Sequence, residues 1–411
     1  MQSRFPGIPL NETSVSPPKE HFNLGQVLTI AGGHFVHDTF TAFLNPLLPL
    51  IIKKLNLSLA LTGSLTLYSR LPSLLNPFIG LWADRIDLRL LVVLAPAGTA
   101  VAMSLIGLAP SYALLALLLL ATGLCSAALH VPGPVIVTRV SGQRTGTGMS
   151  VWMMGGELAR MAGPLFAVAL VSWWSLEGYY PVMLLGLLTS LILHFRFKEI
   201  AVRPQNHSRP TPLGQAWRSL RRLMLPLTAL LLLRSFMRAA LSTFLPIFVT
   251  SGGQSLWFGG TALAVVELAG ALGALVSGTL SDRLDRRLVL LVALICAPLL
   301  MLLFLAVEGD GGLLPFLMLA LTGFTSLSTT PVIMAMVQMY GQEHPATANG
   351  IYMAISFVIG AAAAPLVGWM GDVAGLHAAF FWSAILGLLA APLVLTLPCV
   401  SPEAKILPGP G

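Results

Sequence analysis

Seven charged residues lie inside long apolar stretches of the sequence, where they could bind an ion or carry a proton. They are Asp38, Arg70, Glu157, Arg160, Arg234, Arg238 and Glu267. A charge at the centre of a membrane helix costs about 2.5–3.5 kcal/mol, so we expect these side chains to face a protein interior or an aqueous path and to find partners there. Four arginines against three acids leave one excess positive charge before the histidines are counted.

The spacing of two pairs places their side chains on shared helix faces. Arg234 and Arg238 are four residues apart, as are His34 and Asp38, which is about one helical turn. Two arginines on one face could bind a phosphonate or a carboxylate, since guanidinium groups form bidentate hydrogen bonds with both. Asp38, with His34 or His37 nearby, could carry a coupling proton, and we expect Arg238 to be the ionic partner of its carboxylate. We therefore predict a substrate-binding face on one helix and a proton-carrying face on another.

A third group of candidates lies in the middle of the first half of the chain. Glu157 and Arg160 are three residues apart and can pair within one helix. We place Glu157 with the proton-coupling residues, and Arg160 and His130 with the substrate-binding residues. A structural alternative stays open for every group, because ion pairs can simply hold helices together and His130 can simply pack. Arg70 and Glu267 fit a structural role equally well.

Metal binding and enzymatic chemistry have little support in the sequence. His34, His37, Asp38 and His130 are ligand types that suit a transition metal, but the arginines expected nearby would repel a cation. We therefore predict no metal site and no cofactor. The chain has no nucleotide-binding loop, no GxSxG and no HExxH pattern, which argues against an ATP-driven pump and a membrane hydrolase. We expect a protein that is not an enzyme.

The composition indicates which elements must position these residues. Of the 411 residues, 56% are hydrophobic and only 9% are charged, against about 25% charged in a soluble domain. A spanning helix needs about 20 apolar residues, so the chain could supply roughly eleven or twelve spans. This excludes a soluble globular protein, a disordered chain, a disulfide scaffold and an outer-membrane barrel. The three cysteines form no CxxC pair and read as small hydrophobic residues.

The apolar runs predict an all-α membrane protein with twelve transmembrane helices in two pseudo-symmetric six-helix halves. The expected spans are 26–52, 60–83, 89–109, 112–138, 146–172, 179–197, 222–250, 257–280, 288–307, 313–338, 346–371 and 376–397. We expect an N-terminal tail over 1–25, one bundle over 26–197, a polar linker over 198–221, a second bundle over 222–397 and a C-terminal tail over 398–411.

The distribution of lysine and arginine predicts the orientation of the chain. With a cytoplasmic N-terminus, 17 of the 23 basic residues fall on the cytoplasmic side, only Lys53 and Lys54 fall opposite, and four lie inside spans. Cytoplasmic loops carry an excess of Lys and Arg. We therefore expect an inner, or plasma, membrane protein with both termini in the cytoplasm. The net charge of +7 is then a consequence of topology, and no nucleic-acid partner is expected.

A charged element occurs twice, after the second and the eighth expected span. Gly80-Leu-Trp-Ala-Asp84-Arg85-Ile-Asp87-Leu-Arg89 returns as Gly278-Thr-Leu-Ser-Asp282-Arg283-Leu-Asp285-Arg-Arg287. Glycine permits close helix approach, and the charges can pair with one another and with helix ends. We predict a conformational latch made of eight of the residues that the copies share: Gly80, Asp84, Arg85, Arg89, Gly278, Asp282, Arg283 and Arg287. An ordinary charged loop is the alternative.

With this doubled motif, twelve spans and a central linker, the chain resembles the major facilitator superfamily. The resemblance implies secondary transport by alternating access, a monomer, and a substrate path between the two halves. The segment Ala159-Arg-Met-Ala-Gly163-Pro164 is similar to a motif typical of the family's antiporters. The two glycines usual shortly after that motif are Ala167 and Val168 here.

A finer resemblance is to the fosmidomycin-resistance branch of that family. The similar segments are His34-Phe-Val-His37-Asp38, Asn76-Pro77-Phe-Ile-Gly80, Leu233-Arg234-Ser235 and Thr243-Phe-Leu-Pro246. Where the branch usually has His-Pro-Glu, this chain has His130-Val-Pro132.

Three functional hypotheses follow from these features. The first is a proton-coupled exporter of small anionic or amphipathic compounds, a drug/proton antiporter of the kind associated with antibiotic resistance. The second is a proton-coupled uptake symporter for an organic anion. The third is a non-transporting membrane receptor or scaffold, which the buried charges disfavour because a scaffold needs no ionisable cavity. The expected partners are a small molecule, protons and the lipid bilayer.

Overall fold

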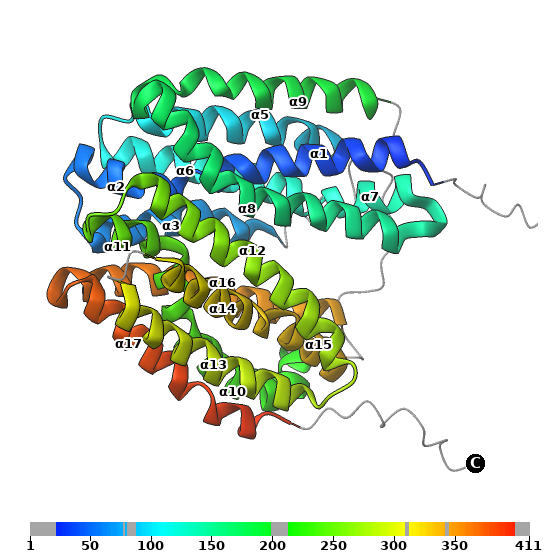
Figure 1. The fold of residues 1–411 in the computed structure, drawn as a ribbon. Coiled ribbons are helices and arrows are strands. Elements are labelled where there is room, and N and C mark those ends of the chain that lie inside the picture. The colour runs from blue at the N-terminus through cyan, green and yellow to red at the C-terminus, as the bar shows by residue number, and fades with distance from the viewer. Residues whose placement is uncertain are drawn as a thin grey trace, which may run out of the picture.

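The computed structural model describes residues 22–76, 79, 88–198, 213–308, 312–341 and 345–398. These residues form helices and contain no strand, and Figure 1 shows two groups of roughly parallel rods lying side by side. The first group consists of α1 (Leu24–Thr41), α2 (Leu44–Leu55), α3 (Leu59–Arg70), η1 (Leu71–Leu75), α5 (Arg89–Leu105), η2 (Ile106–Leu108), α6 (Tyr112–His130), α7 (Gly133–Ser141), η3 (Gly142–Arg144), α8 (Thr145–Gly178), η4 (Tyr180–Val182) and α9 (Met183–Arg196).

The second group holds the rest of the described chain. It consists of α10 (Leu213–Ala239), the π-helical turn η5 (Ala240–Phe244), α11 (Leu245–Ser251), α12 (Leu256–Ser281), α13 (Arg286–Val307), α14 (Leu313–Leu327), α15 (Thr329–Tyr340), α16 (Pro345–Ala374), α17 (Leu376–Leu389) and η7 (Pro392–Thr396). The first helix of this group begins at Leu213, inside the stretch predicted as linker and earlier than the predicted start at residue 222.

Long apolar sequence explains why these helices form and where they can lie. The described residues contain nine helical stretches that are long and apolar enough to cross a membrane, and one of them, Tyr112–Gly178, covers three helices. The predicted all-α membrane class is therefore confirmed, while the count of twelve spans stays a prediction. Serine begins several helices: the hydroxyls of Ser58, Ser111 and Ser255 accept hydrogen bonds from the backbone of α3, α6 and α12.

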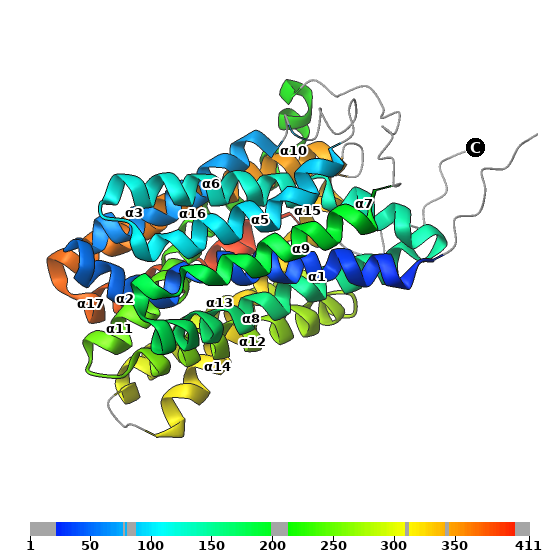
Figure 2. The same ribbon diagram turned by 90° about the horizontal axis from the view of Figure 1, so that it is seen from above.

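Figures 1 and 2 agree on the two ends of the molecule. We call the end that α2, α11 and the start of α17 reach the far end, and the end that holds α7 and α15 the terminal end. The described chain starts near the terminal end. Because most helices run from one end to the other, the polar residues near their middles lie at similar depth.

Four helical rods are interrupted near the middle of the molecule. α1 ends at Thr41 before α2 begins, and α6 ends at His130 before α7 begins at Gly133. In the second group, η5 separates α10 from α11, and α14 gives way to α15 at Ser328. Interrupted helices free backbone groups and favour ligand sites in transporters. Asp38, His130 and Arg238 all lie just before such an interruption.

The two groups contact each other closely toward the far end, along α3 and α16. A Cβ atom added at Gly63 would clash with the backbone of Ala364, and one added at Gly368 would clash with the backbone of Leu59. The carboxylate of Asp372 on α16 accepts hydrogen bonds from the amides of Leu59 and Ala60, at 2.7 and 2.9 Å, and so caps the start of α3. Backbone contact and a cap between the groups therefore close this end.

A second contact between the groups joins α8 and α12. A Cβ atom at Gly260 would lie 2.8 Å from the Val168 side chain and 3.4 Å from the carbonyl oxygen of Pro164. Gly163 and Pro164 belong to the motif that the sequence relates to antiporters. The motif therefore lies on the helix that meets the second group.

Candidate functional site

Three ionisable side chains from two helices form a cluster at the end of α1 and α6. His34 Nε2 lies 3.2 Å from Asp38 Oδ2 and 3.2 Å from His130 Nε2, and His130 Nε2 lies 3.5 Å from Asp38 Oδ1. His34 and Asp38 are buried, as their spacing on one helix face predicts. We call this group the His–Asp cluster. His130 contacts the proton-coupling candidates, because the end of α6 places its ring beside α1. Its role in substrate binding stays a prediction.

Backbone carbonyl groups fix the tautomers of both histidines. His34 Nδ1 lies 2.9 Å from the carbonyl oxygen of Trp152, and His130 Nδ1 lies 2.9 Å from that of Ser126. A carbonyl oxygen only accepts, so each Nδ1 must carry a hydrogen and donate it. In a neutral ring the Nε2 atom then has no hydrogen. Two such nitrogens and the Asp38 carboxylate would be three acceptors facing one another, so the cluster offers a place for a proton, either on one Nε2 atom or on the carboxyl group.

The surroundings of the cluster hold its rings in place. The His34 ring stacks on the buried Trp152 ring of α8, with centroids 3.9 Å apart and an interplanar angle of 19°. A Cβ atom at Gly156 would come within 2.7 Å of the His34 ring and 3.2 Å of Asp38, so this glycine makes room for the cluster. His37 is fully buried beside it, with Nε2 3.9 Å from Asp38 Oδ1.

The His–Asp cluster forms part of the wall of a cavity of about 320 Å³, which we call the polar cavity. Its lining comes from α1, α2, α3, α5, α6 and α8 and includes Asp38, Asn45, Ser69, Arg70, Ser126, His130 and Arg160. The side chain of His130 is 39% exposed, against 7% for Asp38, so the cavity reaches the cluster through this histidine. A carboxylate, imidazole rings and guanidinium groups thus share one space.

Glu157 and Arg160 form the ion pair that their spacing predicts. The Arg160 guanidinium contacts the Glu157 carboxylate within α8, and both side chains are about two-fifths exposed. Arg160 is also close enough to Asp38 and to Glu267 of α12 to interact electrostatically with both. Arg160 therefore lies between Glu157 and the His–Asp cluster. It interacts with acids of both groups of helices, Asp38 in the first and Glu267 in the second.

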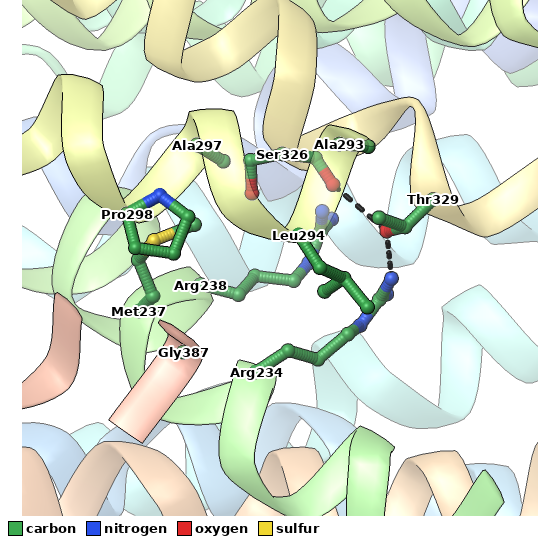
Figure 3. Close-up of a pocket in the computed structure, with 10 residues that line it drawn as sticks. All are labelled: Arg234, Met237, Arg238, Ala293, Leu294, Ala297, Pro298, Ser326, Thr329 and Gly387. Carbon is green, nitrogen blue, oxygen red and sulfur yellow. Dashed lines mark hydrogen bonds between the residues drawn. The ribbon is translucent and has the colours of Figure 1, made fainter. Parts of the chain in front are cut away.

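Arg234 and Arg238 lie together on one face of α10, and Figure 3 shows both reaching toward α13, α14 and α15. Arg234 donates to the hydroxyl groups of Thr329 and Thr330. The space they line is only about 10 Å³, the size of one water molecule. The face predicted to bind substrate is therefore assembled but packed in this conformation.

The expected ion pair between Asp38 and Arg238 is wrong. The partners of Asp38 are His34 and His130, whereas Arg238 interacts electrostatically with Arg234 and with Arg70 of α3. Histidines on α1 and α6 reach the carboxylate first, so the cluster closes within one group of helices. Three arginines are left to face one another where the two groups meet.

Arg70 is the arginine whose role the sequence left open. It is exposed in the polar cavity, and no carboxylate among the described residues pairs with it. Its Nη1 atom lies 3.0 Å from where a Cβ on Gly360 of α16 would stand. The guanidinium of Arg70 is thus available to an anion in the cavity.

The predicted latch is described only in part. Gly80, Asp84 and Arg85 lie outside the described residues. Arg89 donates to the carbonyl groups of Phe197 and Lys198, so it ties the start of α5 to the end of α9 within the first group.

The second copy of the latch shows local contacts. Asp282 lies 3.5 Å from Arg286, and Asp285 accepts from the backbone of Arg287 and begins α13. A Cβ at Gly278 would meet nothing within 4 Å, so the expected close helix approach at this glycine is wrong in this conformation. Arg283 is exposed.

Sequence reasoning missed Trp152, Ser126 and Gly156. The Gly155-Gly156 pair before Glu157 was a signal, because adjacent glycines in a spanning helix permit close approach of another helix. The carbonyl groups of Trp152 and Ser126 accept hydrogen bonds from the histidines, and every residue has such a group, so these contacts gave no signal in the sequence.

Comparisons with known proteins agree with this architecture. Residues 30–363 match the model of the Major Facilitator Superfamily. An uncharacterized MFS-type transporter of Bacillus subtilis is 26% identical over 400 residues, covering 93% of this chain and 95% of the relative. The fosmidomycin resistance protein of Escherichia coli is 23% identical over 400 residues, covering 95% and 97%. A multidrug resistance protein of Citrobacter koseri is 26% identical over 331 residues, covering 73% and 81%.

Solved structures share the fold. A bacterial homolog of the human lysosomal transporter Spinster, in an inward-facing and unoccupied conformation, superposes with a TM-score of 0.74 at 16% identity, covering 90% of this chain and 96% of the other. A D-xylose–proton symporter superposes with a TM-score of 0.66 at 13% identity, covering 90% and 97%.

Proposed function

Because this chain belongs to the major facilitator superfamily, we propose that it is a proton-coupled secondary transporter that exports small anionic or amphipathic compounds by alternating access. One observation carries the proposal. The His–Asp cluster, whose facing acceptors offer a place for a proton, forms part of the wall of a cavity that also exposes Arg70. The group proposed to take up a proton and the group proposed to bind an anion thus lie in the same space.

The His–Asp cluster is the proposed carrier of the coupling proton. An imidazolium between His34 and His130 donates to the Asp38 carboxylate, and loss of the proton leaves acceptors facing one another. The deprotonated cluster is therefore expected to rearrange. Since its side chains lie on α1 and α6, loss of the proton would shift these two helices relative to each other. His37 on α1 and the Glu157–Arg160 pair on α8 complete the charged surroundings.

Arginines from both groups of helices are the proposed substrate ligands. Arg70 and Arg160 come from the first group, and Arg234 and Arg238 from the second. Arg70 and Arg238 repel each other across the boundary between the groups. An anion between them would offset that repulsion, so substrate binding favours approach of the two groups at the terminal end.

The proposed direction rests on the relatives and on charge topology. Two of the relatives are named for resistance to fosmidomycin and to multiple drugs, which supports export. The distribution of lysine and arginine supports cytoplasmic termini. The closed far end would then face away from the cytoplasm, and substrate would enter the polar cavity from the terminal end. We also propose the two bundles, the linker and the tails as divided in the sequence.

A second candidate, uptake of an organic anion by proton symport, is favoured by the sign of the charges. A proton on the His–Asp cluster and an anion at Arg70 attract each other across the polar cavity. Such attraction promotes binding of both together, which is the requirement of a symporter. An antiporter requires instead that the proton and the substrate bind in turn. A neutral or cationic amphipathic compound that binds at Asp38 would meet this requirement, because it would compete with the proton for the carboxylate.

Transport by purified protein in vesicles separates these candidates. We would impose a pH gradient and follow fosmidomycin, with protein-free vesicles as the control. Movement opposite to the protons supports export by antiport, and movement with the protons supports symport. Absence of any flux, for this compound and for a panel of organic anions, would favour a receptor or scaffold.

A further inference from the structure

An apolar groove lies beside Arg70, between the two groups of helices. Its volume is about 480 Å³, and its lining comes from α3 and η1 on one side and α16 on the other. The lining includes Leu67, Leu71, Leu74, Phe357, Val358 and Leu366. Each of its residues is apolar, and several, among them Leu74 and Val358, are about half exposed. In a bilayer this groove is a place for a hydrocarbon chain.

Arg70 joins the apolar groove to the polar cavity. It lies between Leu67 and Leu71 of the groove along the chain, and it also lines the polar cavity. Its Nη1 atom lies 3.0 Å from where a Cβ on Gly360 would stand, and Gly360 directly precedes Ala361 of the groove, so the charge lies close to the groove. A cation that pairs with no carboxylate of the described residues therefore lies where an apolar space meets a polar one.

We propose that the transported compound is a single-chain amphiphile with an anionic headgroup. Its headgroup pairs with Arg70 in the polar cavity, and its hydrocarbon chain lies in the groove between α3 and α16. This proposal rests on the proposed function, because it names the class of compound that the same cavity carries. Charge complementarity selects the occupant: the Arg70 guanidinium has no carboxylate partner among the described residues, and a carboxylate or phosphate headgroup supplies one.

The apolar chain and the charge make separate contributions, so two variants can remove them one at a time. Arg70→Gln removes the charge and leaves a shorter polar side chain, and Arg70→Lys keeps the charge without the bidentate geometry. Ala362→Phe fills the groove, because Ala362 is an exposed part of its lining. Lys53→Gln and Leu187→Phe are the matched controls, since both side chains are exposed and outside the two sites.

The test is equilibrium binding of radiolabelled dodecanoate to the full chain in lipid nanodiscs, corrected for uptake by empty nanodiscs. Methyl dodecanoate lacks the charge, and butyrate lacks the long chain. We expect Arg70→Gln to weaken dodecanoate binding by about tenfold, the effect of losing one charge-assisted contact, with Arg70→Lys intermediate. We expect Ala362→Phe to weaken dodecanoate but not butyrate, and the control variants to bind as the unaltered chain does.

Several outcomes would overturn the proposal. Equal binding of dodecanoate and its methyl ester would mean that the groove simply holds the chain of a membrane lipid. If Arg70→Gln bound dodecanoate with full affinity, the headgroup would not contact Arg70. If a folded Ala362→Phe variant did so, the hydrocarbon chain would not lie in the groove. These failures differ from a failure of the proposed function: pH-driven transport without dodecanoate binding refutes only the amphiphile, and dodecanoate binding without pH-driven transport refutes only the coupling.

Discussion

Single side chains in this protein are oriented by groups that carry no charge. The carbonyl oxygens of Trp152 and Ser126 each accept a hydrogen bond from Nδ1 of a histidine. These hydrogen bonds orient both Nε2 atoms toward Asp38. The carboxylate then acts as counter-charge to a protonated ring, so the proton in the proposed cycle is carried by the histidine pair and held by Asp38. This division of roles leads to a specific expectation for Asp38.

Asp38→Asn should uncouple transport from the pH gradient. The amide lacks the negative charge that stabilises the imidazolium, and hydrogen bonds to a charged group are worth about 1.5–3 kcal/mol, or roughly tenfold to a hundredfold in proton affinity. We expect loss of pH-driven accumulation, with exchange of substrate for substrate retained because exchange moves no net proton. Both are measured in the same vesicles. Loss of both would indicate a structural ion pair, and retention of both would place the coupling proton elsewhere, with Glu157 next to test.

Arg234→Ala and Arg238→Ala should weaken the binding of an anionic substrate and leave folding largely intact. Both arginines lie near the end of α10 and reach into the same small space. Loss of one charge-assisted contact predicts about tenfold weaker binding, measured by the ligand-induced rise in melting temperature. Since Arg234 also donates to Thr329 and Thr330, its removal should cost more stability than that of Arg238. Unchanged affinity in both well-expressed variants would exclude them as substrate ligands.

The sequence predicted part of this site, and the reason for the limit is physical. One-turn spacing correctly placed His34 with Asp38 and Arg234 with Arg238, because helical periodicity is local. The contact between His130 and Asp38 depends on how α6 packs against α1, and 92 residues separate them in the chain. The expected pairing of Asp38 with Arg238 was wrong for the same reason.

At the scale of the helix, interruptions decide where polar groups can gather. α1, α6 and α10 each end close to a functional side chain. Long apolar runs predicted where the helices lie, because spanning a bilayer imposes length and composition. They did not predict the breaks, since Pro132 or Pro246 can bend a spanning helix without ending it.

The contact between α3 and α16 leads to a prediction about one glycine. Gly368→Ala should destabilise the closed far end, because the added methyl group would clash with backbone at Leu59 rather than with a side chain that can move. Overpacking of this kind costs about 1–3 kcal/mol. The measurement is thermal unfolding of the purified protein.

Gly32→Ala is the matched control, because a Cβ there meets nothing within 4 Å. Alanine favours helix over glycine by up to about 1 kcal/mol, so this variant should be as stable as the unaltered chain or more stable. If the two variants melted alike, the far-end contact would not contribute to stability.

For the whole molecule, the internal repeat carries the predicted latch. Asp84→Asn should slow turnover more than it weakens substrate binding, because a latch biases a conformational equilibrium without touching the ligand. Asp282→Asn should do less harm, since Asp282 is exposed and contacts Arg286 only one turn away. Transport rates and affinities of both variants test this. An Asp84→Asn variant that transports at the unaltered rate would remove any gating role.

Alternating access predicts that the two ends of the molecule open and close in opposite directions. Here the two groups of helices meet at the far end, through the cap that Asp372 places on α3 and through Gly260 against α8. A substrate bound between Arg70 and Arg238 offsets their repulsion and should draw the groups together at the terminal end. The far-end contacts must then separate, because a substrate enclosed at the terminal end can leave only through the far end.

Spin labels on a variant without the native cysteines can follow this exchange. One pair, at Lys53 and Gln254, reports the far end. The other pair, at Gln143 in η3 and Arg283 between α12 and α13, reports the terminal end, and all four side chains are exposed. Adding an anionic substrate should shorten the terminal-end distance and lengthen the far-end distance in the same population. Changing the pH should shift the same equilibrium, and Asp38→Asn should abolish the pH response while the substrate response remains. If both distances shortened together or lengthened together, or if only one of them changed, the result would contradict alternating access for this chain.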